Sequence, residues 1–130
     1  MTTTDTIHSS SSNFTLKIKS HITCASENII YIIHCKKCQV QYVGESSNTL
    51  RTRMNNHRFD INTNRETPVG RHFNLPDHSL ALLQVTGIEC NFRSNILRKQ
   101  RESYFIHKMK TLTPNGLNID SGVFSDLSII

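Results

Sequence analysis

The sequence predicts an α+β domain in which a small three- to four-stranded mixed or antiparallel sheet is flanked by helices. Two observations support this fold class. Residues 28–35 and 39–45 are rich in Ile, Val and Tyr, which favour strands, and only a short turn separates them. Apolar residues then recur at helical spacing in 49–62 and 94–111, and both segments begin at residues that can cap a helix. These elements can bury their apolar faces by packing in layers.

Weaker patterns indicate the remaining elements of the predicted domain. We expect a short helix at 66–74, a strand at 81–89 and a short strand or extended segment near 117–120. The sequence shows no internal repeat, so these elements belong to one unit rather than to an array.

The chain is expected to hold a single domain at 27–120. Its 130 residues are 36% hydrophobic, which is enough for one modest core. Residues 1–26 are rich in Ser and Thr and are expected to be flexible, although the alternating run at 14–19 could add an edge strand; residues 121–130 are expected to be a tail. The N-terminus has no apolar signal region and no window resembles a membrane span, so we expect no membrane association.

Two tyrosines and a glycine mark the predicted hairpin. Tyr31 lies in its first strand, Tyr42 in its second, and Gly44 ends the second strand. A strand-end glycine can let another backbone or a phosphate approach closely. On its own, however, the hairpin fits equally well a core that buries two amphipathic tyrosines.

The predicted helix at 49–62 presents basic side chains on two stripes. Arg53 and His57 lie one turn apart beside the apolar face, whereas Arg51 and Arg58 share another stripe. Residues four positions apart are neighbours on a helix surface, so the side chains of Arg53 and His57 are expected to lie side by side.

A carboxylate lies on the apolar half of the predicted helix at 94–111. Glu102 falls between Phe105, Ile106 and Met109 when successive residues are placed about 100° apart. Acidic residues are rarely buried unless they are paired. The sequence leaves two partners open, an ion pair with Arg98 one turn earlier or a metal ion.

The cysteines and two histidines predict a zinc site. Cys35 and Cys38 form a CxxC in the hairpin turn, and His72 and His78 follow 33 residues later with five residues between them. Two thiolates and two imidazoles make a closed tetrahedral zinc site with a structural role. The alternatives are a reduced surface CxxC with two solvated histidines, or Cys24 in place of one histidine. A redox role is disfavoured because a redox CxxC is expected at a strand-to-helix junction, whereas this CxxC lies in a hairpin turn.

The hairpin and the helix after it resemble the GIY-YIG nuclease family. The family's GIY is represented by Ile29-Ile30-Tyr31 and its YIG by Tyr42-Val43-Gly44. The main departure is Ile29 in place of the first glycine, a position that serves the backbone rather than catalysis. The resemblance extends over roughly residues 28 to 119 and implies a GIY-YIG-like fold.

The resemblance also implies the members of a catalytic site. Arg53 takes the position of the family's helix arginine, with Arg51 as a competitor, and His57 takes the position one turn later. Glu102 takes the position of the single metal-binding glutamate. In the closing segment Pro114-Asn115-Gly116-Leu117-Asn118, Asn118 takes the position of the asparagine that supports the site.

The zinc-knuckled form of the motif is similar to the endonuclease domain of Penelope-like retroelements. The similarity rests on YIIHCKKCQVQYVGES, LRTRMNNHR and HFNLPDH. In those elements the domain follows a reverse transcriptase and is implied to nick target DNA, which exposes a 3′ end as primer. This context implies fusion to, or action with, a reverse transcriptase, and a nuclear location.

These implications predict a metal-dependent DNA endonuclease that hydrolyses a phosphodiester. We expect Glu102 to hold one Mg²⁺ (or Mn²⁺), since Mg²⁺ binds through few carboxylates and keeps several waters. Tyr31 is the expected general base, which requires its pKa to be depressed by neighbours. Tyr42 would position the water or phosphate, and Arg53 would offset developing charge. His57 is expected to be a proton shuttle or a phosphate ligand.

The charge of the chain favours duplex DNA as the partner. The net charge is +5 and the pI about 9.2. The arginines between the hairpin and the second histidine are expected to contact phosphates without reading sequence: Arg51, Arg53, Arg58, Arg65 and Arg71. The absence of Trp argues mildly against single-strand recognition. Two alternatives remain open, a non-catalytic zinc-stabilised nucleic-acid-binding module and a thiol redox protein.

Overall fold

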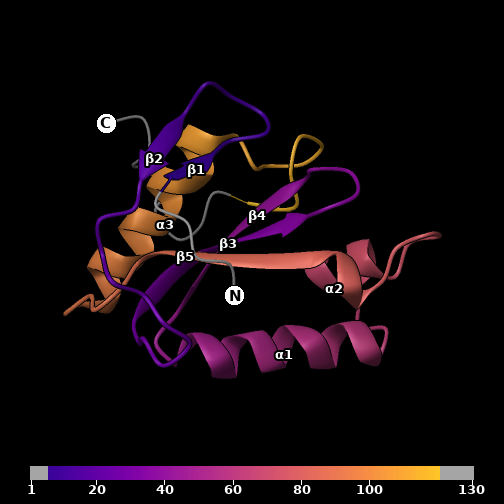
Figure 1. Ribbon diagram of the computed structural model, residues 1–130, viewed down its shortest axis with the longest axis horizontal. Coiled ribbons are helices and arrows are strands. Elements are labelled where there is room, and N and C mark those ends of the chain that lie inside the picture. Colours follow the sequence, from indigo (N-terminus) through magenta and orange to yellow (C-terminus); the bar gives the residue numbers. More distant parts are fainter. Residues whose placement is uncertain (1–5, 121–130) are drawn as a thin grey trace.

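The computed structural model describes residues 6–120, and the tail expected at 121–130 lies outside this range. Five strands and three α-helices with one 3-10 turn follow one another along the described chain (Figure 1). The elements are β1 (Thr6–His8), β2 (Thr15–Lys17), β3 (Ile29–Cys35), β4 (Gln41–Ser46), α1 (Leu50–Asn62), α2 (Pro68–Phe73), the 3-10 turn η1 (Leu80–Leu82), β5 (Leu83–Glu89) and α3 (Asn95–Met109).

The central sheet has three strands in the order β4-β3-β5, and both pairings are antiparallel. The α+β class is confirmed, with an antiparallel rather than a mixed sheet. Tyr31 on β3 lies opposite Gly44 on β4, and Ile33 lies opposite Tyr42. Because β4 pairs on one side only within this sheet, it is an edge strand, next to which other groups can gather.

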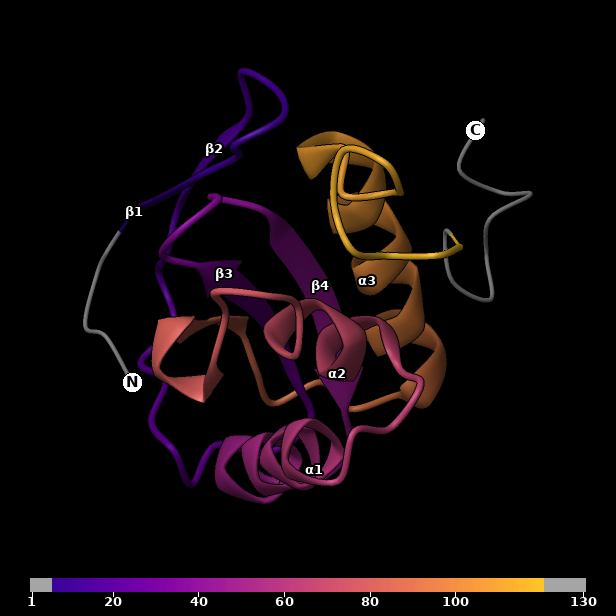
Figure 2. The ribbon, with the colours of Figure 1, turned by 90° about the vertical axis from the view of Figure 1, so that its right-hand side faces the viewer.

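The two faces of β3 are buried against different helices, which explains why its apolar run is continuous rather than alternating. The face that carries Ile29, Tyr31 and Ile33 packs against α1 and α2. The other face carries Ile30 and Ile32 and packs against α3. Figure 2 shows α1 and α3 on opposite sides of the sheet, with β4 running between them.

Residues 6–17 of the segment that was expected to be flexible contain two short strands, and the second lies in the alternating run that could add a strand. β1 and β2 pair as a separate antiparallel hairpin whose apolar side chains pack on the α3 side of the core. In the turn, Ser9 Oγ donates to the Met109 carbonyl (2.6 Å) and Ser12 Oγ to that of Lys108 (2.8 Å). The serines thus satisfy carbonyls that the end of α3 leaves without helical partners.

The remaining predictions of elements agree with the structure in existence and differ in extent. Thr49 and Ser94 are the N-caps of α1 and α3, and their side chains accept bonds from backbone N–H groups of the first turn. Near 117–120 the structure has a single parallel bridge between Leu112 and Asn118 instead of a strand. In the described part of the chain, no helix is long and apolar enough to span a bilayer.

Candidate active site and metal cluster

A buried hydrogen-bonded group joins β3 to α1. Arg53 Nε donates to the Tyr31 hydroxyl over 2.9 Å, and the same hydroxyl lies 2.7 Å from His57 Nε2. Since Arg53 can only donate, the Tyr31 oxygen accepts this bond. The Tyr31 hydroxyl proton is then directed to His57. Arg53 is therefore the arginine of this group, while Arg51 is exposed about 200° away around the helix.

Burial decides the protonation of this pair. It raises the pKa of Tyr31 above its ordinary value, and the opposing effect of Arg53 is smaller, so the expectation of a depressed pKa is wrong. Burial, followed by the charge of Arg53, lowers the pKa of His57 to about 3. At neutral pH the imidazole is uncharged and accepts at Nε2. Its Nδ1 is buried and has no partner in the described part of the chain.

Gly44 admits the ring of Tyr31 across the strand pair. A Cβ built at Gly44 would lie 2.2 Å from Tyr31 Cζ, far inside van der Waals contact. The close approach expected at this glycine is thus made by a side chain rather than by a phosphate or a backbone. Tyr42 lies two residues earlier on β4, with its ring centroid 5.9 Å from that of His57. Burial raises the pKa of Tyr42 as well.

Glu102 approaches this group from α3, on the other side of β4. It is half-buried and makes no hydrogen bond or ion pair within residues 6–120. The ion pair with Arg98 that the sequence left open is not formed, because Arg98 Nε binds Glu45 Oε2 at 2.6 Å instead. Burial, and then the nearby charge of Glu45, raises the pKa of Glu102 to about 7. A half-buried carboxylate without a partner is suited to holding a cation.

Asn118 uses its side chain to fix β4. Its Oδ1 accepts from the Val43 N–H (2.9 Å) and from Thr111 Oγ1 (2.8 Å), and its Nδ2 donates to the Val43 carbonyl (2.9 Å). Val43 lies between Tyr42 and Gly44, so Asn118 holds this part of the edge strand in place. Both ends of the Asn118 side-chain amide are therefore engaged in hydrogen bonds within the fold.

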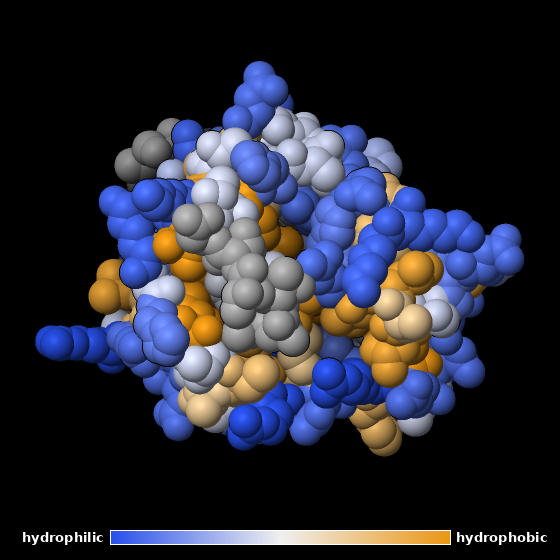
Figure 3. All heavy atoms as spheres, in the orientation of Figure 1, coloured by the Kyte–Doolittle hydropathy of each residue, from blue (hydrophilic) through white to orange (hydrophobic). Residues whose placement is uncertain are grey.

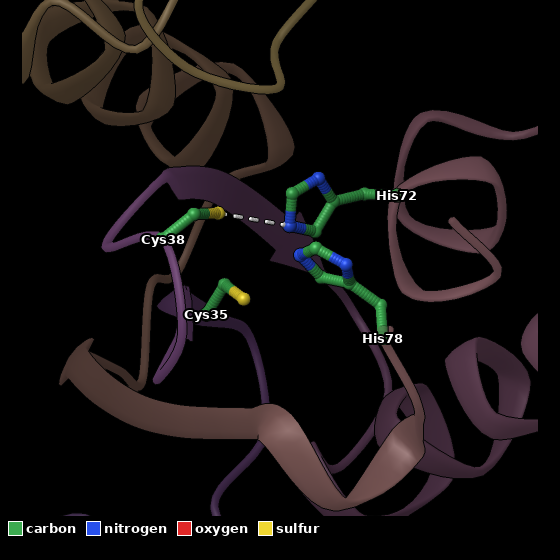
Figure 4. Close-up of side chains that lie close together, drawn as sticks. All are labelled: Cys35, Cys38, His72 and His78. Carbon is green, nitrogen blue, oxygen red and sulfur yellow. Dashed lines mark hydrogen bonds between the residues drawn. The ribbon is translucent and has the colours of Figure 1, made fainter. Parts of the chain in front are cut away.

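The four predicted zinc ligands come together at the end of the hairpin. One ligand atom from each of Cys35, Cys38, His72 and His78 lies within 4.8 Å of the others. Figure 4 shows the two cysteines at the hairpin turn facing the two imidazoles, with Cys38 Sγ 3.3 Å from His72 Nε2. Cys24 does not belong to this cluster.

The donor set of the cluster fits a metal ion. His78 Nδ1 bonds the Pro76 carbonyl at 3.0 Å, which requires the proton on Nδ1 and leaves a lone pair on Nε2. That Nε2 is buried and has no hydrogen-bond partner within residues 6–120. Such a hydrogen bond to the distal nitrogen is the usual means of orienting a metal-binding histidine. Burial, followed by His78, also lowers the pKa of His72, which favours its neutral form.

Of the five arginines predicted to contact phosphates, Arg53 is half-buried against Tyr31; the other four are exposed but do not form one group. Arg51 and Arg58 lie about 20° apart on the outer side of α1, whereas Arg65 and Arg71 approach Asp60 and Glu66 at 3.9 and 4.0 Å. Exposed pairs of this length contribute little to stability and leave the guanidinium groups available. The face of the molecule in Figure 3 is largely hydrophilic, with hydrophobic patches between the polar side chains.

Sequence reasoning missed the residues that connect α3 to β4. Glu45 accepts from Arg98 (2.6 Å) and from Lys99 (2.8 Å). No local spacing reveals this contact, because more than fifty positions separate the partners in the chain. The acidic residue directly after Gly44 was the only available signal.

Comparisons with known proteins assign the chain to a family. The family model described as the GIY-YIG catalytic domain matches residues 27–118, so the chain belongs to the GIY-YIG family and is a nuclease domain. Among solved structures it resembles the catalytic domain of the homing endonuclease I-TevI, with TM-score 0.60, 22% identity and coverage of 72% of this chain and 97% of that one.

A second structure, a mutant of the catalytic domain of the intron endonuclease I-TevI, gives TM-score 0.62, 21% identity and coverage of 72% and 94%. At this identity the two structures support the fold. No match is found among curated protein sequences.

Proposed function

We propose that this domain is a metal-dependent endonuclease that hydrolyses phosphodiester bonds of duplex DNA. The observation that carries the proposal is Glu102, a half-buried carboxylate of α3 with no hydrogen bond or ion pair in the described chain, whose charge acts on Tyr31 and is acted on by Arg53. The electrostatic effect of Glu102 on both tyrosines supports its location beside this group. A site with a cation-seeking carboxylate and an arginine suits a charged phosphate.

Glu102 is the residue that would hold a divalent cation, Mg²⁺ or Mn²⁺. When bound, such an ion supplies Lewis-acid stabilisation of a phosphate oxygen and of the leaving oxygen. Burial makes an unpaired carboxylate unfavourable, and a cation removes this penalty. Arg53 adds a guanidinium that can offset charge on the phosphate, and the half-buried Tyr42 can orient the phosphate or the attacking water.

Tyr31 and His57 form a proton relay in this proposal. The Tyr31 hydroxyl accepts one bond from Arg53 and directs its proton to His57 Nε2, so one lone pair of the oxygen remains. The attacking water passes a proton to the Tyr31 oxygen as the phenolic proton moves to His57. The relay needs no phenolate, which the raised pKa of Tyr31 disfavours. It starts from a neutral His57, which the lowered pKa of about 3 provides, and it ends with a protonated His57, which the same burial and the charge of Arg53 disfavour.

The Cys/His cluster is proposed to hold one structural zinc ion. Four N and S donors within 4.8 Å of one another match the preferences of zinc, and four protein ligands leave no position for a substrate. The thiols and imidazoles come from the hairpin turn, from α2 and from the loop after α2. The ion therefore joins elements on the same side of the sheet as α1. Because the two cysteines face two histidines in a set of four metal ligands, a metal-binding role suits them better than a redox role.

The biological context is proposed from the motif resemblance alone. We propose that the domain acts with a reverse transcriptase in a Penelope-like retroelement, that it nicks DNA to prime reverse transcription, and that it works in the nucleus. The arrangement of the cysteines and histidines around the nuclease motif supports this context.

Incubation of supercoiled plasmid with the zinc-loaded protein tests the activity. With added Mg²⁺ the plasmid should become nicked, whereas without an added divalent ion it should stay supercoiled. DNA binding without nicking under any of these conditions would favour the non-catalytic zinc-stabilised binding module.

A further inference from the structure

One carboxylate of β4 is gripped by two cations of α3. Arg98 Nε donates to Glu45 Oε2 at 2.6 Å, and Lys99 Nζ donates to Glu45 Oε1 at 2.8 Å. The side chains of Arg98 and Glu45 are 5% and 15% exposed, so this contact lies in the interface and not on the surface. We call these three residues the clasp.

The clasp also reaches the start of β3. Arg98 Nη1 donates to Asn28 Oδ1 (3.0 Å) and to Asn95 Oδ1 (2.8 Å). The guanidinium thus touches the residue before β3, a carboxylate of β4 and the first turn of its own helix. Buried ion pairs are weak sources of stability, because desolvation offsets their attraction, and one attested use is to fix the register of packed elements.

The geometry of the clasp defines the placement of α3. Arg98 and Lys99 are consecutive and project about 100° apart, so their grip on one carboxylate sets the rotation of the helix about its axis. A slip of one turn along the axis would move every later residue by about 5.4 Å. Glu102 is one turn beyond Arg98 on the same side of the helix.

The other end of the clasp lies at the site itself. Glu45 directly follows Gly44, which packs against the ring of Tyr31. The short segment 42–45 of β4 therefore contacts the Tyr31 group on one face and holds α3 on the other.

We propose that Arg98 and Lys99 are positioning residues of the nuclease reaction, which set the position of Glu102 relative to Tyr31 through their grip on Glu45. The inference rests on the proposed nuclease function and on Glu102 as its cation-binding residue. The clasp residues make no hydrogen bond or ion pair with Glu102, although the charge of Glu45 raises the pKa of Glu102 and that of Lys99 lowers it. The proposed effect on the reaction is their placement of α3.

Arg98→Lys tests this inference, and Arg101→Lys is its matched control. Both substitutions keep the charge and remove the planar fork of the guanidinium. Arg101 makes a corresponding contact with the other edge strand of the sheet, with two bonds to Glu89 at the end of β5 (2.9 and 2.7 Å). If these contacts only attach α3 to the sheet, both variants should lose nicking activity. If Arg98 positions Glu102, only Arg98→Lys should lose it.

The readout is plasmid nicking by the whole chain as a function of Mg²⁺ concentration, with DNA affinity measured separately in the absence of divalent ions. For Arg98→Lys we expect a kcat at least about tenfold lower, the scale of a small misplacement of a reacting group. The Mg²⁺ concentration at half-maximal rate should rise, and DNA affinity should be unchanged. Arg101→Lys should nick within about twofold of the parent, since its contact is remote from the site.

Lys99→Gln decides the matter if Arg98→Lys does not fold, because the Lys99 side chain is 36% exposed and its loss leaves Arg98 paired. It should show the same rise in Mg²⁺ requirement, and Lys99→Arg should restore the parent value. Two results would overturn the inference: an unchanged Mg²⁺ dependence of nicking in folded clasp variants, or a loss of nicking in Arg101→Lys equal to that in Arg98→Lys. If Glu102→Gln is inactive in the same assay, the nuclease proposal itself would still stand. A parent protein that does not nick would overturn the nuclease proposal and the inference together.

Discussion

The protonation of single side chains determines what the site can do. Tyr31, His57 and Glu102 are each far more buried than in an unfolded chain, and burial favours the neutral form of all three. For Tyr31 and His57 neutrality is what the proposed relay requires. For Glu102, burial favours the protonated form, and a bound cation would have to displace that proton. Burial therefore keeps Tyr31 and His57 neutral at the start of the proposed relay, and in the proposed cation site it disfavours a charged Glu102 unless an ion is bound.

The lowered pKa of His57 predicts a specific sensitivity to acid. In the unfolded chain this histidine binds a proton below about pH 6.5, while in the fold its pKa is about 3, so falling pH favours unfolding. At pH 5 the loss should be about 2 kcal/mol relative to pH 7, from 1.36 kcal/mol per unit. Urea unfolding at both pH values should show a smaller loss in His57→Gln than in the parent.

The exposed His107 provides the control for this measurement. His107→Gln should lose as much stability between pH 7 and pH 5 as the parent, because His57 and its lowered pKa remain in place in that variant. An identical pH dependence in His57→Gln and the parent would show that His57 is not held neutral by the fold.

At the scale of elements, the metal cluster is expected to connect the hairpin with α2. Cys38→Ser removes one thiolate from a set whose members come from the hairpin turn, α2 and the following loop. Because metal binding and folding are coupled in such sites, zinc content and thermal stability should fall together. Elemental analysis and thermal melts measure the two. Cys24→Ser, outside the cluster, should retain about one zinc per chain.

A protein that contains less than about half an equivalent of zinc, and whose melting is unaffected by Cys38→Ser, would contradict the proposed zinc site.

The sequence was informative wherever local spacing determines structure. The Ile-rich run predicted β3, the four-residue interval predicted that Arg53 and His57 lie side by side, and the CxxC with its two histidines predicted the cluster. Contacts between distant segments were not accessible in this way. The clasp residue Glu45 and the serine cap of α3 at Ser9 join positions dozens of residues apart, and no periodicity encodes such pairs.

Burial was the second quantity that the sequence did not reveal. Alternation cannot tell how deeply a tyrosine lies once helices cover both faces of the sheet, so the direction of the Tyr31 pKa shift was predicted incorrectly. The pairing of Gly44 with Tyr31, which admits the ring, became visible only with the strand register.

For the whole molecule, the positive charge predicts salt-dependent binding to DNA. If the exposed arginines contact phosphates, affinity should fall steeply with ionic strength. Arg58→Ala should reduce the slope of log K against log salt by about one unit. Titration of a labelled duplex at several salt concentrations measures this slope. Arg93→Ala, an exposed arginine outside the 51–71 region, serves as control and should leave the slope unchanged.

Binding that stays constant between low and physiological salt would show that the net charge of +5 serves another purpose.

The most direct test of the account is the nicking activity of Glu102→Gln in Mg²⁺. The substitution keeps the shape of the side chain and removes the charge that would hold the cation. We expect the variant to fold, to bind duplex DNA like the parent and to nick at least about a hundredfold more slowly, the scale on which loss of a transition-state charge contact is felt. A Glu102→Gln protein that nicks supercoiled plasmid at nearly the parent rate would contradict the assignment of Glu102 and the site built around it.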